Sequence, residues 1–177
     1  LFAPSGIKRT NHMGLSLSFP IPLNCIMMQG ESISIDGICM TAEKASAKHF
    51  SVFAMEETLR KTHLLKVAKN HLFNLERCLT LNALLGGHLV SGHIDSTGIV
   101  RKVINKNGSK ALSIQIPRKF TKYIVYKGSI AVNGVSLTIV DVGSNMFTVS
   151  LIPYTISHTN LGTITEDDVA NIEVDII

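Results

Sequence analysis

Residues 32–41 read Ser-Ile-Ser-Ile-Asp-Gly-Ile-Cys-Met-Thr, and residues 129–138 read Ser-Ile-Ala-Val-Asn-Gly-Val-Ser-Leu-Thr. The second stretch repeats the first at an offset of 97 positions, and the same offset aligns Asn74-Leu75-Glu76 with Asn171-Ile172-Glu173. A period of about 100 residues is the size of a small domain and too long for a solenoid repeat or a propeller blade. The sequence therefore predicts a tandem duplication of one binding domain, with two copies of one ligand site.

Each copy of the repeat begins with the pattern of a β-hairpin. Residues 32–35 and 129–132 alternate small or polar with β-branched side chains, and the dipeptides that follow them, Asp36-Gly37 and Asn133-Gly134, tolerate the positive φ that a tight hairpin turn needs. Further strands are expected at 38–41, 50–53 and 74–77 and at their second copies 135–142, 147–150 and 171–175. A short helix is expected at 56–62, and its second copy begins with Pro153. Short strands separated by Gly-rich turns predict an all-β chain with one small closed barrel in each half.

The 177 residues divide most naturally into 1–85 and 86–177, two halves that can each bury a modest core. Residues 78–85 are apolar and uncharged, so we expect this segment to pack between the barrels and not to form a flexible linker.

Composition excludes several classes of function. The net charge of +4 is small, its Lys and Arg are scattered, Trp is absent and aromatic residues make up only 6%, which is not the pattern of a nucleic-acid binder. Three cysteines form no metal-binding pair or disulfide framework and indicate a reducing, cytoplasmic location. The apolar run at 15–28 follows Lys8-Arg9 like a targeting signal, but it contains two prolines and is too short to span a membrane, so we expect a strand and a loop there.

The stretch Gly86-Gly87-His88-Leu89-Val90-Ser91-Gly92-His93 is the densest candidate for a functional site. Its two histidines are five residues apart and interrupted by glycine, so they do not match a helical zinc motif. Glycines allow the backbone to approach a ligand closely. The alternative is a Gly-rich turn that enters the second barrel.

The two hairpins differ where Cys39 in the first copy becomes Ser136 in the second, while Thr41 and Thr138 are retained. Side chains two apart on a strand share a face, so these groups could hydrogen-bond a ring or transfer a proton. The alternative for Cys39 is a small buried hydrophobe.

A third paired element is Glu56-Glu57-Thr58, which aligns with Pro153-Tyr154-Thr155. A carboxylate or phenol beside a threonine suits a hydroxyl-rich ligand. The alternative is a solvent-exposed helix start, where acidic residues are favourable. Lys127, which precedes Gly128, could likewise bind a ligand or simply be solvated.

Taken together, these residues resemble the α-chain type of riboflavin synthase, a family with duplicated lumazine-binding barrels. The resemblance rests on 86–93, on Tyr123–Ile130, on Asn133–Thr138 and on Leu151-Ile152-Pro153, with their first-copy counterparts at 36–41 and 55–60. It covers residues 30 to 177. It implies two six-stranded Greek-key β-barrels, each of which binds 6,7-dimethyl-8-ribityllumazine, and no metal or cofactor.

The family reaction is a dismutation, in which one lumazine donates a four-carbon unit to another and gives riboflavin and 5-amino-6-ribitylaminouracil. The resemblance further implies a homotrimer with sites shared between neighbouring subunits, and lumazine synthase as a partner. Nucleic acids and membranes are not expected as partners. The rival reading is a non-catalytic lumazine- or flavin-binding protein of the antenna type. Such proteins lose histidines of the glycine-rich stretch, and both are present here.

Site residues carry over by position. The resemblance implies catalytic roles for Ser32, Cys39, His93, Asn133 and Ser136. It implies substrate-binding roles for Phe2, Gly6, Met40, Thr41, Phe53, Ala54, Met55, Glu57, Thr58, His88, Gly92, Ile94, Lys127, Leu137, Thr138, Ile152, Pro153, Tyr154, Thr155 and Ser157. Glu57, Thr58, Tyr154 and Thr155 are expected to face the ribityl chain.

Two features depart from the family pattern. Relatives open with Met-Phe-(Thr/Ser)-Gly, whereas this chain has two extra residues between Phe2 and Ser5-Gly6. Relatives also continue into a C-terminal helix that holds their trimer together, and this chain ends at Ile177 before such a helix.

Overall fold

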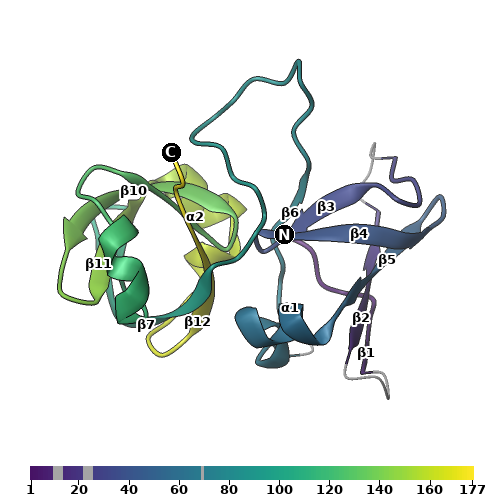
Figure 1. Cartoon of the computed structure of the whole chain (residues 1–177), viewed down its shortest axis with the longest axis horizontal. Coiled ribbons are helices and arrows are strands. Elements are labelled where there is room, and N and C mark those ends of the chain that lie inside the picture. Colours follow the sequence, from purple (N-terminus) through teal and green to yellow (C-terminus); the bar gives the residue numbers. More distant parts are fainter. Residues whose placement is uncertain (10–13, 22–25, 69) are drawn as a thin grey trace.

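The computed structural model describes residues 1–9, 14–21, 26–68 and 70–177. Figure 1 shows two β-rich lobes side by side, the first from purple to blue and the second from green to yellow. Each lobe contains six strands and one short α-helix. The predicted all-β duplication is therefore confirmed. None of the helices among the described residues is long and apolar enough to cross a membrane.

The first sheet has the strand order β1-β2-β5-β4-β3-β6. Its strands are β1 (Gly6–Arg9), β2 (Leu15–Pro20), β3 (Ser32–Ile35), β4 (Ile38–Ala45), β5 (His49–Ala54) and β6 (Leu75–Arg77). Helix α1 (Glu56–Lys61) and the 3-10 turn η1 (His63–Leu65) follow β5. The expected strand at 15–28 is present as β2, and residues 22–25 of that run lie outside the described residues.

The second sheet closes into a barrel with the order β10-β11-β8-β7-β12-β9. Its strands are β7 (Ser96–Lys106), β8 (Ser109–Gln115), β9 (Ser129–Val132), β10 (Val135–Val142), β11 (Met146–Leu151) and β12 (Val169–Val174). The 3-10 turn η2 (Arg118–Tyr123) precedes β9, and helix α2 (Pro153–His158) and the 3-10 turn η3 (Asn160–Gly162) precede β12.

The two lobes differ in how they close. Strands β7 and β12 pair along four residues, but their counterparts β1 and β6, which the structure describes in full, do not pair. A single bridge between Phe2 and Phe73 stands in for that seam. The first lobe thus has the strand order of the second, with a single bridge in place of a continuous closing ladder, in agreement with the expected two-barrel fold.

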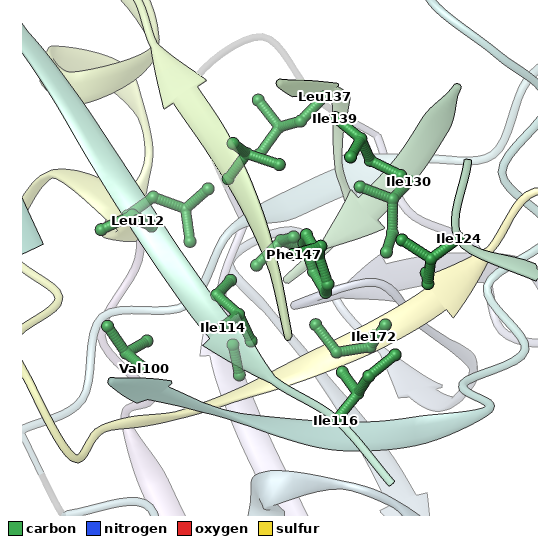
Figure 2. Close-up of a cluster of buried hydrophobic side chains, with 14 of the residues drawn as sticks. Val100, Leu112, Ile114, Ile116, Ile124, Ile130, Leu137, Ile139, Phe147 and Ile172 are labelled. Atoms are coloured by element: carbon green, nitrogen blue, oxygen red, sulfur yellow. The ribbon is translucent and has the colours of Figure 1, made fainter. Parts of the chain in front are cut away.

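Both cores follow from strands that alternate buried and half-buried side chains. In the first lobe, Phe19 stacks on Phe50 with ring centroids 5.5 Å apart and meets Phe73 edge to face. In the second lobe, Phe147 lies amid Ile114, Ile130 and Ile172 (Figure 2). Phe50 and Phe147, which the 97-residue offset aligns, are both buried. Each large apolar side chain buried in this way stabilises its lobe by about 1.5–3 kcal/mol.

The segment between the lobes does not pack as the sequence predicts. The side chains of Leu79, Leu81, Leu84 and Leu85 are exposed, and Leu81 and Leu84 are almost fully so. Figure 1 shows this stretch as a loop that extends away from both lobes. The expectation that residues 78–85 pack between the barrels is wrong. The lobes instead contact each other through their hairpin turns, where a Cβ added to Gly37 would lie 2.6 Å from the backbone N of Gly134.

Candidate functional site

The glycine-rich segment 86–93 touches the same strand position in both halves of the chain. The backbone N–H of Cys39 on β4 donates to the carbonyl of Gly92 at 2.8 Å. Ser136, the counterpart of Cys39 on β10, accepts the backbone N–H of His88 at 3.3 Å. One segment thus connects the two equivalent positions that sequence comparison singled out.

Glycine is required at both contacts. A Cβ on Gly92 would lie 2.6 Å from the Cβ of Cys39, and a Cβ on Gly87 would lie 2.5 Å from the Oγ of Ser136. Both glycines also have positive φ, which side chains with a Cβ seldom adopt. The glycines of this segment therefore allow its backbone to lie directly against the two hairpins.

His88 and Ser136 form a side-chain pair in the second half. The Nδ1 of His88 lies 2.7 Å from the Oγ of Ser136, while its Nε2 is buried and has no hydrogen-bond partner among the described residues. If Nδ1 carries the proton and donates to Ser136, then Nε2 is free to accept one from a ligand. In the other tautomer, Ser136 donates and Nε2–H is the donor. Either way, a buried ring nitrogen without a partner marks a place for a polar ligand atom.

A buried glutamate holds the segment in place. The carboxylate of Glu173 on β12 accepts the backbone N–H of Ser91 at 2.6 Å, its hydroxyl at 2.7 Å and the backbone N–H of Gly92 at 3.0 Å. Sequence reasoning missed this role, although the repeated Asn-x-Glu of 74–76 and 171–173 was its signal. Hydrogen bonds to a charged acceptor are about twice as strong as neutral ones, so Glu173 fixes the backbone that contacts Cys39.

The surroundings of Cys39 are partly shielded from water. Cys39 is half-buried on β4. Partial burial raises the pKa of the Cys78 thiol, and the neighbouring Cys39 and Glu76 raise it further. Partial burial also raises the pKa of Glu76 itself. These groups border the first hairpin face on the side of β6.

The two helix starts lie on the outside of the lobes. Glu57 forms an ion pair with Lys61 at 2.9 Å, and the ring of Tyr154 stacks on that of His158 with centroids 4.0 Å apart. The hydroxyl of Ser157 donates to the carbonyl of Pro153 at 3.0 Å. This arrangement agrees with the alternative of a solvated helix start, and a role in holding the ribityl chain stays a prediction.

The remaining predicted residues fall into three groups. Met40, Ala54, Gly92, Asn133 and Leu137 are buried. Phe2, Phe53, Thr58, His88, Ile94, Ser136 and Thr155 are half-buried. Ser32, Thr41, Met55, His93, Lys127, Thr138, Ile152, Pro153 and Tyr154 are exposed, and so are Gly6, Glu57 and Ser157. The structure joins Cys39 with Gly92, and Ser136 with His88, whereas Phe2 pairs with Phe73 on another side of the first sheet.

The predicted catalytic residue Asn133 lies at the junction of the two lobes. Its Oδ1 accepts the backbone N–H of Asn171 at 2.8 Å, and its Nδ2 donates to Asn160 at 3.2 Å. The Asn133 side chain thus stabilises the hairpin turn in which it lies, and its catalytic role stays a prediction.

The junction has an approximate twofold symmetry that sequence reasoning missed. The backbone N–H of Asn160 donates to Asn74 Oδ1 at 2.9 Å, and at the equivalent place that of His63 donates to Asn171 Oδ1 at 2.9 Å. The amide of Asn74 donates to the carbonyl of Asn133, and that of Asn171 donates to the carbonyl of Asp36. The repeated Asn74 and Asn171 were the signal, because an asparagine at the same place in both copies can bond reciprocally across an interface.

Asp36 is the charged member of this junction. Burial acts to raise the pKa of its carboxyl, but the hydrogen bonds and charges of His63 and His71 outweigh burial and hold the pKa below its usual value. A cavity of about 530 Å³ lies beside this group, and Asn133 is the only predicted site residue that lines it.

Comparison with known proteins agrees with this architecture. The Lumazine binding domain family matches residues 6–78 and 91–175. The chain is 40% identical over 148 residues to riboflavin synthase of Actinobacillus pleuropneumoniae, which covers 84% of this chain and 69% of that protein. It is 38% identical over 174 residues to riboflavin synthase of Bacillus amyloliquefaciens, which covers 97% of this chain and 80% of that protein.

Solved structures share the fold. The crystal structure of LumP complexed with riboflavin superposes with a TM-score of 0.89 at 20% identity, over 98% of this chain and 95% of that one. LumP complexed with 6,7-dimethyl-8-(1'-D-ribityl) lumazine gives 0.86 at 19% identity. Identity this low supports the fold alone, whereas the family match and the curated relatives carry the assignment. The chain therefore belongs to the riboflavin synthase family of duplicated lumazine-binding domains, and it is an enzyme.

Proposed function

We propose that this chain is a transferase that converts two molecules of 6,7-dimethyl-8-ribityllumazine into riboflavin and 5-amino-6-ribitylaminouracil. One substrate gives up a four-carbon unit and the other receives it, so the atoms of two substrates equal those of the two products. No external oxidant, reductant or cofactor enters that balance. The protein then has to hold two rings in register and move protons between them.

The observation that carries this proposal is the double contact of segment 86–93, with Gly92 on Cys39 and His88 on Ser136. A dismutation of two like molecules needs two like pockets, and the duplication of the hairpins supports their presence. It also needs unlike chemistry in the two pockets, because one ring is the donor and the other the acceptor. A thiol at Cys39 and a hydroxyl paired with histidine at Ser136 provide that difference.

Proton transfer is assigned to the second pocket. The methyl group at C7 of one lumazine must lose a proton before its carbon can attack the other ring. The unpartnered Nε2 of His88 is the group best suited to accept that proton, since Ser136 orients the ring through Nδ1. Most of the remaining acceleration comes from holding the two rings in the correct relative position.

The two pockets are completed in an assembly. We propose a homotrimer in which the first pocket of one subunit faces the second pocket of its neighbour. The exposed leucines of segment 79–85 support this arrangement, since a contiguous apolar stretch on a soluble surface marks an interaction site. The proposal includes a division of the chain into 1–85 and 86–177, a cytoplasmic location and lumazine synthase as a partner.

The test is turnover by the purified protein. Incubation with the lumazine should produce riboflavin, followed by its absorbance, and His88→Gln should lower kcat with little change in the far-UV circular dichroism. The matched control is His49→Asn, because His49 is exposed on β5 and lies outside the proposed site. Activity per subunit should fall on dilution as the assembly dissociates.

The second candidate is the antenna type of lumazine-binding protein, which the similarity to LumP favours at the level of the fold. It predicts stoichiometric binding of the lumazine without riboflavin formation at any protein concentration. That result would replace the transferase proposal.

A further inference from the structure

Three side chains that can bind a metal ion converge at the junction of the lobes, away from segment 86–93. They are Asp36 in the β3–β4 turn, His63 in η1 and His71 just before β6, and one ligand atom from each lies within 4.8 Å of the others. No other such group of three occurs among the described residues. A carboxylate with two imidazoles is a ligand set that zinc accepts.

The spacing of the ligand atoms suits a single ion. The Oδ2 of Asp36 lies 2.8 Å from the Nε2 of His71 and 3.1 Å from the Nε2 of His63. Ligand atoms bound to zinc at about 2.0–2.1 Å in a tetrahedron lie about 3.3 Å apart. Small side-chain rotations would therefore open the present spacing enough to admit the ion.

The Nε2 of His63 is available to bind an ion. It is buried, and among the described residues its one polar neighbour is the Asp36 carboxylate, whose Oδ2 lies 3.1 Å away. The His63 side chain is 2% exposed. A buried ring nitrogen with no partner besides a carboxylate is free to serve as a metal ligand beside that carboxylate.

The carboxylate is already oriented by other groups. The Oδ1 of Asp36 accepts the backbone N–H of Asn74 at 2.7 Å and the Nδ2 of Asn160 at 2.8 Å. These bonds leave Oδ2 to face the two imidazoles. Such outer-sphere bonds fix first-sphere ligands in metal sites, and here Asn160 supplies one of them from the second half of the chain.

The duplication shows that the fold itself does not need this ligand set. At the offset of 97, Asp36, His63 and His71 correspond to Asn133, Asn160 and Asp168. The second copy thus holds the same junction with amides, and its histidine positions carry Asn and Asp. The three ligands therefore occur only in the first half of the duplication, and the second half folds with other residues at these positions.

Two of the three ligands border a cavity. His63 and His71 both line the cavity of about 530 Å³, together with Asn160 and Asp168. An ion held by three side chains would keep a fourth position open toward this space, where water can complete the tetrahedron.

We propose that Asp36, His63 and His71 form a binding site for one zinc ion or a similar divalent transition-metal ion, which fastens the junction between the two lobes. This proposal does not rest on lumazine turnover. The ion neutralises a carboxylate that is 0% exposed, and through Asn160 it links the first half to the second.

The test is Co²⁺ binding by the whole protein after treatment with a chelator. We expect one equivalent of Co²⁺ to give the visible bands of a four-coordinate ion and Zn²⁺ to displace it. His63→Asn, which copies the residue of the second half, and His71→Asn, which removes the second imidazole, should each weaken binding roughly tenfold or more. His49→Asn is the matched control and should bind as the wild type does. Zn²⁺ should also raise the thermal midpoint of the wild type and not that of the double variant.

Three results would overturn the proposal. The first is no stoichiometric Co²⁺ binding by the wild type. The second is unchanged binding in His63→Asn and His71→Asn, with circular dichroism showing that both variants are folded. The third is a thiolate-to-Co²⁺ charge-transfer band, which would assign the ion to cysteine instead. Each readout is independent of riboflavin formation, so failure of this site leaves the proposed activity untouched.

Discussion

Replacing Gly134 by alanine should push the two lobes apart where their hairpin turns meet. The turns of the two hairpins meet head to head, and a Cβ on Gly134 would lie 2.7 Å from the backbone N and 2.8 Å from the Cα of Gly37. Backbone atoms cannot rotate away as a side chain can. Overpacking of this kind destabilises by about 1–3 kcal/mol. The φ of +79° at Gly134 adds about 1–2 kcal/mol of strain for a residue with a Cβ.

The sum is about 2–5 kcal/mol, a large part of the roughly 5–15 kcal/mol by which native proteins are stable. Urea unfolding followed by circular dichroism measures it, and a single transition that splits into two would report uncoupled lobes. The matched control is Gly108→Ala, since Gly108 has a φ of +77° but no atom within 4 Å of its added Cβ. That variant should lose only the strain of about 1–2 kcal/mol. If Gly134→Ala loses no more stability than Gly108→Ala, the contact between the turns contributes nothing and the reasoning fails.

Three further outcomes are expected. Cys39→Ser and Ser136→Cys should reduce kcat for riboflavin formation to different degrees because donor and acceptor pockets need different groups, and equal negligible effects would mean that this strand face only packs. Glu173→Gln should weaken the charged hydrogen bonds that anchor segment 86–93 by about 1.5–3 kcal/mol. It should clearly lower kcat and shift the thermal midpoint of unfolding only a little, whereas an unchanged kcat would contradict the anchoring role. Burial lowers the pKa of the Lys110 ammonium, and the charge of Asp168 partly offsets this effect. Between the lowered pKa and the ordinary lysine value of 10.5, the unfolded chain therefore binds more protons than the folded chain does. The stability of the folded state should rise with pH across that range. Lys110→Met should remove that slope in urea titrations at several pH values and destabilise by about 2 kcal/mol or more, because three backbone carbonyls lose the ammonium donor; an unaltered slope would show that another group titrates.

Local features were predictable from sequence because they depend on neighbouring residues. Asp36-Gly37 and Asn133-Gly134 form the expected tight turns, with positive φ at all four residues. Strands β3, β4, β9 and β10 begin where the alternation predicts, and Pro153 opens α2 as expected. The repeat itself implied one topology for both halves, and the shared strand order bears this out. Turn chemistry and period-two burial act over a few residues, so a single sequence is enough to reveal them.

Sites that join distant residues were not predictable in the same way. The pairing of Cys39 with Gly92 and of Ser136 with His88 depends on how segment 86–93 crosses between the hairpins. The exposure of Leu81 and Leu84 depends on the two turns having taken the space between the lobes.

The duplication, the all-β class and the hairpins of this protein were determined by its sequence alone, because they follow from local backbone preference and from repetition. The tertiary structure decided that Asp36, His63 and His71 meet at one point, that a single bridge joins the edges of the first sheet and that the lobes face each other through Gly37 and Gly134. These features depend on contacts between residues up to about a hundred positions apart, and no pattern within a short window of sequence encodes the distance between two such side chains.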